Sequence, residues 1–241
     1  MKSFTAAELS AHIETSLNKL KTLLDDYKVT NKKRAILLGY WISDYVFYIS
    51  KEDTYNYPIY KYERGDIVQV NFGYRIGNEI GGRHFAVVID TDNSIKQKIL
   101  TVVPLMSLKE NSKDGKYTFT LRKGLFELHN DKLNKLTAEL ENSKNEIDKM
   151  INDPDSDVDH RKIIKKLRKL QKQMKELQTF QSAIQRLKAG SIIDAGQIVT
   201  ISKMRISNPK NSKDSLNKIK LSNEDLDALN EKLKSLYINI S

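Results

Sequence analysis

The stretch ERGDIVQVNFGYRIGNEIGGRHFAVVID, residues 63–90, decides the fold of this 241-residue chain. It contains two short runs rich in Val, Ile and Phe, DIVQVNF and HFAVVID, and five of the chain's ten glycines fall between Gly65 and Gly82. Apolar runs of this length, bounded by glycine and charged residues, predict β-strands. The glycines predict a loop between the strands whose backbone can approach another molecule closely.

Three further runs of the same kind follow along the chain. They are ILTVVPL at 99–105, KYTFTLR at 116–122 and QIVTISKMRI at 197–206. The five runs together predict a small antiparallel sheet or barrel. The predicted fold class is therefore α+β, because helical patterns both precede and interrupt these strands.

Helical periodicity dominates the chain before residue 60. Thr5 and Glu8 have the spacing of a capping box, and leucines and isoleucines at helical intervals predict an amphipathic helix over residues 6–27. A second helix, about 31–50, contains the apolar run AILLGYWISDYVFYI and is apolar on most faces. That run is too short and too polar to span a bilayer, so we expect no membrane segment and interpret it as a core helix.

A second helical region, roughly residues 126–189, interrupts the strands. Apolar residues at heptad-like positions run up to and beyond the segment NDPDSDVDH, where Pro154 ends one helix. The pattern predicts an antiparallel helical hairpin with arms of about 40 Å. A last amphipathic helix is expected from Ser222 to Tyr237. The predicted domains are a helical segment at 1–60, a barrel at 61–124 and 190–241, and the hairpin at 125–189.

Composition narrows the function. The formal net charge of +10 and the isoelectric point of about 9.4 make an acidic polymer a plausible partner. The absence of cysteine excludes disulfides and thiolate catalysis, and it fits a reducing cytoplasm. No phosphate-binding glycine motif occurs and the four histidines are scattered, so we expect no metal and no cofactor.

Four blocks in order give the chain a family resemblance. They are Arg64-Gly65-Asp66, Gly77 to Gly82, Val102-Val103-Pro104-Leu105 and Gln197 to Ile201. The order resembles the PemK/MazF family of bacterial toxins, which are sequence-specific, metal-independent endoribonucleases. The resemblance implies a five-stranded barrel, a homodimer, single-stranded RNA as the substrate, and a cognate antitoxin that blocks the RNA groove.

The chain departs from this family at the catalytic positions. Aligned on Gly81-Gly82, the family's catalytic Arg falls on His84, and its catalytic Thr falls on Met106. Arg83 and Ser107 stand next to these positions. Because strand side chains alternate, neighbours point to opposite faces unless a bulge intervenes.

RNA cleavage without metal uses the substrate's 2′-hydroxyl as the nucleophile and leaves cyclic-phosphate and 5′-hydroxyl ends. A His suits proton transfer near neutral pH, and Arg75 or Arg83 can hold the phosphate. Ser107 can replace the family's Thr if a bulge turns it inward. We therefore take His84, Ser107 and Arg83 as catalytic candidates, although His84 could instead be a core histidine.

The candidate RNA-binding residues lie in the glycine-rich loop and in the last strand. They are Arg75, Asn78, Glu79, Gly81, Gly82, Lys203 and Arg205. Lys203 and Arg205 are expected to share a strand face by their spacing, although basic residues at a sheet edge also discourage aggregation. Glu79 is interpreted as fixing the loop, not as a catalytic acid.

Two alternatives stay open. In one, the altered catalytic positions mark a non-catalytic module that binds RNA or protein and acts through the hairpin. In the other, a related barrel poisons DNA gyrase, although the matching blocks are the RNA-cleaving ones. The basic run HRKIIKKLRKLQKQMKELQ, residues 160–178, fits contact with nucleic acid, a second subunit, an antitoxin or the ribosome, and a protein contact ranks above RNA here.

Overall fold

The structure is a computed structural model that describes residues 4–57, 59–109, 112–122, 124–152, 160–184 and 190–238. By its internal contacts the chain divides into two units. The first consists of residues 1–56 and 72–82, and the second of residues 57–71 and 83–241. The predicted division at 1–60, 61–124 with 190–241, and 125–189 remains a prediction.

The first unit contains two helices and the loop 72–82. Helix α1 (Ala6–Thr30) begins with the predicted capping box, in which Glu8 N donates to Thr5 Oγ1 at 3.3 Å and Thr5 N donates to Glu8 Oε2 at 2.8 Å. Helix α2 (Lys32–Lys51) begins at Asn31, whose side chain accepts from Arg34 N at 3.1 Å. Both helices therefore begin at polar side chains that satisfy free backbone donors.

The prediction that α2 is a core helix is wrong. Leu38 is its only buried residue among those described, and α1 has none. Tyr40, Tyr45 and Phe47 are all more than half exposed. Helix α1 contacts α2, but a helix that is apolar on most of its faces needs neighbours on several sides to bury them.

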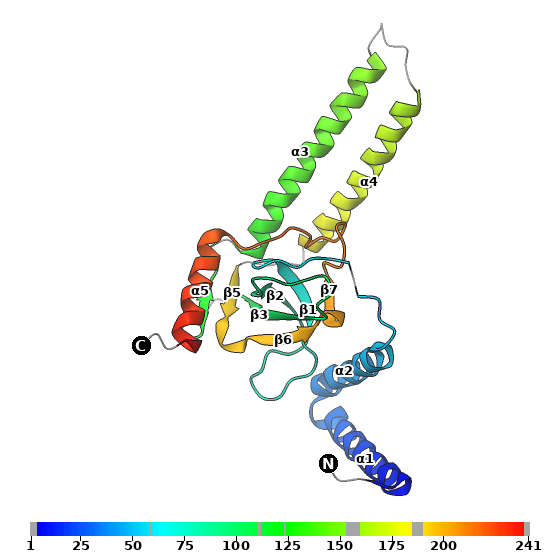
Figure 1. The fold of residues 1–241 in the computed structure, drawn as a ribbon, viewed down its shortest axis with the longest axis vertical. Helices are drawn as coiled ribbons and strands as arrows, with labels where there is room; N and C mark the ends of the chain where they lie inside the picture. Colours follow the sequence, from blue (N-terminus) through cyan, green and yellow to red (C-terminus); the bar gives the residue numbers. More distant parts are fainter. Residues whose placement is uncertain are drawn as a thin grey trace. The chain divides into compact units, whose positions relative to one another are not determined.

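The second unit is built on an antiparallel sheet of seven strands (Figure 1). The strands are β1 (Ile67–Asn71), β2 (Arg83–Val88), β3 (Ile99–Ser107), β4 (Thr118–Thr120), β5 (Ser191–Asp194), β6 (Val199–Ser202) and β7 (Ile206–Asn208). Their order is β4-β5-β3-β2-β1-β7, and β6 also pairs with β3. Within the described residues the sheet is not closed, since β4 and β7 do not pair with each other.

The sequence predicts five strands, and the two extra ones have clear origins. Strand β5 is a four-residue strand that directly follows Gly190 and is too short to give a periodic pattern. The run QIVTISKMRI, expected as one strand, is divided into β6 and β7 by a short 3₁₀ helix, η2 (Lys203–Arg205). Lys203 and Arg205 consequently do not share a strand face.

The central strands are buried on both faces. On one face Ile67, Val87, Val103 and Ile193 form a core with the last helix, α5 (Asn223–Tyr237). On the other face Val68, Val70, Ala86 and Val102 are fully buried as well. Ser222 caps the N-terminus of α5, as predicted, and Leu229 of this helix is fully buried.

Helices α3 (Leu125–Asn152) and α4 (His160–Ile184) contact each other and run in opposite directions (Figure 1). Lys166 of α4 forms an ion pair with Glu146 of α3 at 2.9 Å. The first turns of α3 belong to the core, where Leu125 is buried and Leu128 and Leu133 pack against it. The connection predicted around Pro154 lies outside the described residues. None of the helices in the described part of the chain is long and apolar enough to cross a membrane.

Candidate functional site

The catalytic candidates lie at one end of the sheet, where β2 begins and β3 ends. Arg83 is the first residue of β2, and Ser107 is the last residue of β3. In the β1–β2 ladder His84 lies opposite Val70 and Arg83 lies opposite Asn71. Successive side chains of a strand point to opposite faces, and residues directly opposite in a ladder share a face. His84 therefore lies on the face of Val70, and Arg83 lies on the other face with Asn71.

The β2–β3 ladder extends this grouping to the second candidate position. Phe85 pairs with Leu105, and alternation along each strand from this pair puts Met106 on the face of His84 and Ser107 on the face of Arg83. Ser107 also pairs with Ser191 of β5. Arg83 and Ser107 therefore share one face, and His84 shares the other face with Met106.

Exposure differs between the two faces. The side chains of Arg83 and Ser107 are exposed, whereas His84 and Met106 are half-buried. An exposed guanidinium is accessible to a phosphate and can bind it with two hydrogen bonds, and a half-buried imidazole is shielded from bulk water on part of its surface. Two consecutive residues, Arg83 and His84, therefore place a permanent cation on one face of the sheet and an imidazole on the other.

The structure corrects the expectation for Lys203. Its side chain is 1% exposed and its Nζ donates to the Ser94 carbonyl at 3.0 Å, over the ring of Tyr62 at 5.6 Å. Burial lowers the pKa of this ammonium, although Asp90 opposes the shift. A buried ammonium that bonds a backbone carbonyl is a structural group, so Lys203 does not line a surface groove for RNA.

Arg205 has a similar local role. Its Nε donates to the carbonyl of Asn71, the last residue of β1, at 2.8 Å. This bond ties the end of η2 to the end of β1. The bond occupies one of the guanidinium donors, so a contact of Arg205 with RNA has to come from the others.

The glycine-rich loop, described by itself, is fixed by backbone bonds. Phe72 N donates to Gly82 O and Gly82 N donates to Gly73 O, both at 2.7 Å. A Cβ on Gly81 would lie 2.8 Å from the carbonyl oxygen of Gly73, so the close approach of these two segments of the loop requires glycine. A Cβ on Gly73 would lie 2.6 Å from Trp41 of α2, so this helix contacts the loop directly.

Arg75 and Glu79 lie across the loop from each other. Arg75 Nη1 lies 3.3 Å from Glu79 Oε2, and Arg75 Nε donates to the Phe72 carbonyl at 3.1 Å. This supports the interpretation of Glu79 as a loop-fixing acceptor. Asn78 and Glu79 are exposed, and Arg75 is half-buried.

The Arg64-Gly65-Asp66 block lies at the other end of β1 and joins three elements. The Arg64 guanidinium donates to the Ile89 carbonyl and to Asn230 of α5. Gly65 has a φ of +87° and donates its N–H to Val88 O at 2.8 Å. These bonds make the block a structural joint, and it contributes no group to the end of the sheet that carries His84.

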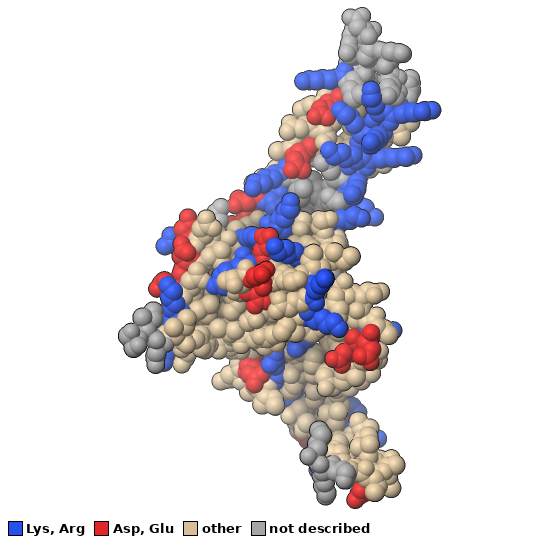
Figure 2. All heavy atoms as spheres, viewed as in Figure 1, with Lys and Arg blue, Asp and Glu red and all other residues tan. Residues whose placement is uncertain are grey.

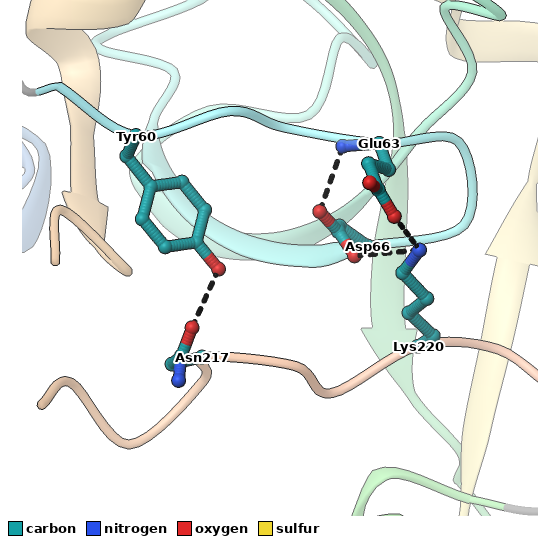
Figure 3. A network of polar contacts seen from close by, with 5 residues as sticks. All are labelled: Tyr60, Glu63, Asp66, Asn217 and Lys220. Carbon is teal, nitrogen blue, oxygen red and sulfur yellow. Dashed lines mark hydrogen bonds and ion pairs between the residues drawn. The ribbon is translucent and has the colours of Figure 1, made fainter. Parts of the chain in front are cut away.

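A polar network that the sequence did not reveal lies beside this joint (Figure 3). Asp66 accepts from Glu63 N at 2.8 Å, and Lys220 lies 3.7 Å from Asp66 and also pairs with Glu63. Burial raises the pKa of Asp66, while the bond from Glu63 and the charge of Lys220 oppose that shift. The network ties the segment before β1 to the segment before α5.

Tyr60 extends the same connection, because its hydroxyl donates to Asn217 Oδ1 at 2.9 Å (Figure 3). Burial, with a contribution from Asp66, raises its pKa to about 12. The phenol therefore remains a neutral donor. Within the described part of the chain, no group of three or more His, Asp or Glu side chains is placed to hold a metal ion.

These features define an α+β protein with an open antiparallel sheet, a glycine-rich loop between its first two strands, and Arg, His and Ser at the end of that sheet. Residues 63–186 match the family described as PemK-like, MazF-like toxin of type II toxin-antitoxin system, which is about half of the chain. The chain belongs to this toxin family. The match includes the α3–α4 pair. No individual curated protein matches the chain.

Proposed function

We propose that this chain is a toxin-type endoribonuclease that cleaves single-stranded RNA without a metal ion. One observation carries the proposal within the family: a half-buried His84 stands beside an exposed Arg83 at the end of β2. The first offers a titratable group and the second a permanent cation. Both chemistries are needed when the substrate's own 2′-hydroxyl is the nucleophile.

In the proposed reaction neutral His84 accepts the proton of the 2′-hydroxyl. The 2′-oxygen then attacks the adjacent phosphorus, and the bond to the leaving 5′-oxygen breaks. The 5′-oxygen takes a proton from water, and protonated His84 returns its proton to solvent, so the products are a 2′,3′-cyclic phosphate and a 5′-hydroxyl. Arg83 offsets the negative charge that develops on the phosphate oxygens.

The sequence-based roles of the remaining candidates belong to this proposal. Ser107 lies on the Arg83 face, so we assign it a hydrogen bond to the phosphate and no proton transfer. The exposed loop residues Asn78 and Glu79 and the backbone at Gly81 and Gly82 contact the RNA strand, together with Arg75. A cognate antitoxin covers the same residues, the chain forms a homodimer, and it acts in the cytoplasm.

The test is incubation of the purified chain with a mixed-sequence RNA in EDTA, followed by end-group analysis. We expect cyclic-phosphate and 5′-hydroxyl ends that disappear in His84→Ala. The matched control is His12→Ala, because His12 is exposed on α1 and remote in sequence from the candidates. Cleavage that persists unchanged in His84→Ala overturns the assignment of His84.

A second candidate function is a non-catalytic member that acts by binding. The observation that favours it is Met106, which shares the face of His84 and supplies no hydrogen bond of the kind a threonine gives. This alternative predicts RNA binding by the wild-type chain with no new ends. The same end-group analysis separates the two functions.

A further inference from the structure

The basic charge of this chain is concentrated on one arm of the hairpin. Residues 161–175 of α4 contain eight of the chain's 41 Lys and Arg residues and no Asp or Glu. These eight charges account for most of the formal net charge of +10. Figure 2 shows the basic side chains gathered over α4.

The other arm does not neutralise this charge. Helix α3 carries six acidic and four basic residues, whereas α4 carries eight basic residues and one acidic residue. The paired arms therefore keep a clear positive excess even with ion pairs such as Lys166–Glu146.

The exposed cations of α4 form a continuous row. Arg161, Lys165, Arg168, Lys172 and Lys175 recur at alternating intervals of four and three residues, which places them along one side of a helix. All five are exposed. At 1.5 Å per residue the row is about 21 Å long, enough to face several consecutive phosphates of one nucleic-acid strand.

We propose that this row on α4, the α4 cation row, is a second RNA-binding surface that holds the phosphate backbone of single-stranded RNA outside the catalytic residues. The inference rests on the proposed function only for the choice of RNA as the polyanion. Lysine and arginine rows of this kind bind phosphates without reading sequence, and they release counterions as they bind. The affinity of the whole chain for long RNA therefore depends on α4 and on salt.

The test measures binding of a 30-nucleotide RNA in which every 2′-hydroxyl is methylated, so that it cannot be cleaved. Fluorescence anisotropy at 50–300 mM KCl compares wild type with the triple variant Lys165→Gln, Arg168→Gln, Lys172→Gln. For a single strand, each neutralised phosphate adds about 0.7 to the steepness with which log affinity falls against log salt. The loss of three contacts is therefore expected to make this dependence shallower by about 2. We expect the affinity at 100 mM KCl to fall by at least about tenfold.

The matched control removes the same charge from the other arm. The variant Lys135→Gln, Lys144→Gln, Lys149→Gln changes three exposed lysines of α3. We expect its slope and affinity to stay near those of wild type. A charge-preserving variant, Lys165→Arg, Arg168→Lys, Lys172→Arg, retains binding, and circular dichroism checks that all three variants keep their helices.

The outcomes separate the possible errors. Equal losses in the α4 and α3 variants overturn the inference, because binding then follows net charge alone. A 30-residue poly-glutamate serves as a competitor. If it binds the chain more tightly than RNA does, and competes with RNA only when the α4 cation row is intact, the row is reassigned to an acidic protein. Cleavage that persists while the α4 variant binds RNA like the control overturns this inference and leaves the proposed function intact. Binding through α4 without cleavage overturns only the proposed function.

Discussion

His84 lies directly opposite Val70 in the β1–β2 ladder, and Val70 is fully buried. The imidazole therefore projects from the face of the sheet that carries Val70, while Arg83 and Ser107 belong to the other face. An active site built at this end of the sheet has to draw its groups from around the strand ends. We therefore expect His84 and Ser107 to have different roles, and their substitutions to have effects of different size on RNA cleavage.

Substitutions of His84 and of Ser107 distinguish the roles of these two residues. We expect His84→Ala to lower kcat/KM for RNA cleavage by about 100-fold or more, the usual range for loss of a proton-transfer group. Ser107→Ala, which removes one hydrogen bond to the phosphate, is expected to cost less than about tenfold. Equal losses in the two variants contradict the separation by faces and indicate a local bulge that turns Ser107 inward.

The loop between β1 and β2 depends on Gly81. In Gly81→Ala the new Cβ meets the backbone oxygen of Gly73 at 2.8 Å and the backbone nitrogen of Arg75 at 3.2 Å, so the loop has to shift. We expect the free energy of unfolding to fall by about 1–3 kcal/mol and the KM for RNA to rise. The measurements are urea unfolding and steady-state cleavage.

Gly39→Ala is the control for this loop variant. A Cβ at Gly39 of α2 meets nothing within 4 Å. Alanine in a helix interior is favoured over glycine by about 1 kcal/mol, so this variant is expected to be slightly more stable and equally active. A Gly81→Ala protein that behaves like Gly39→Ala contradicts the account of the loop.

Stability is expected to depend on pH through His129 of α3. Burial lowers its pKa below the ordinary 6.5, although the Leu125 carbonyl at 2.7 Å opposes the shift. The unfolded chain therefore binds a proton at a pH where the folded chain does not, so stability is full above pH 6.5 and declines as the pH falls toward the folded-state pKa.

The test compares urea unfolding at pH 5–7.5 in wild type, His129→Leu and His12→Gln. We expect His129→Leu to flatten the decline below pH 6.5, because it removes the titrating group from the folded and the unfolded chain alike. His12→Gln, in an exposed position of α1, keeps the wild-type profile. An unchanged slope in His129→Leu contradicts the role of His129.

The docking of α5 is expected to account for a large part of the stability. Leu229 is fully buried within the core cluster, so Leu229→Ala is expected to lower the free energy of unfolding by about 2–5 kcal/mol. Leu17→Ala on α1 is the control, because Leu17 is 60% exposed, and its expected cost is below about 1 kcal/mol. Similar costs for both variants contradict the packing of α5 described above.

Local patterns predicted the elements that carry their own signals. The capping box at Thr5, the Val- and Ile-rich strands around the glycine loop, and the apolar face of α5 all depend on residues close together in sequence. Strand alternation alone places Arg83 and His84 on opposite faces of the sheet. These features need no knowledge of distant contacts.

Features set by distant contacts were not predictable in the same way. The burial of Lys203 depends on Ser94 and Tyr62, more than 100 residues earlier in the chain, and spacing alone placed it wrongly on a strand face. The exposure of α2 depends on how much of its surface a partner helix covers. The Glu63–Lys220 and Tyr60–Asn217 contacts likewise join residues 157 positions apart.

The central claim is that the 2′-hydroxyl of the RNA is the nucleophile and that His84 moves its proton. It is tested most directly with an RNA that carries a single 2′-deoxynucleotide at the mapped cleavage position, incubated in EDTA with wild type and with His84→Ala. We predict that wild type cleaves the all-ribose RNA, leaving a cyclic phosphate, and does not cleave the deoxy-substituted RNA, while His84→Ala cleaves the all-ribose RNA at least about 100-fold more slowly. Cleavage of the deoxy-substituted RNA at that position by wild type contradicts the account.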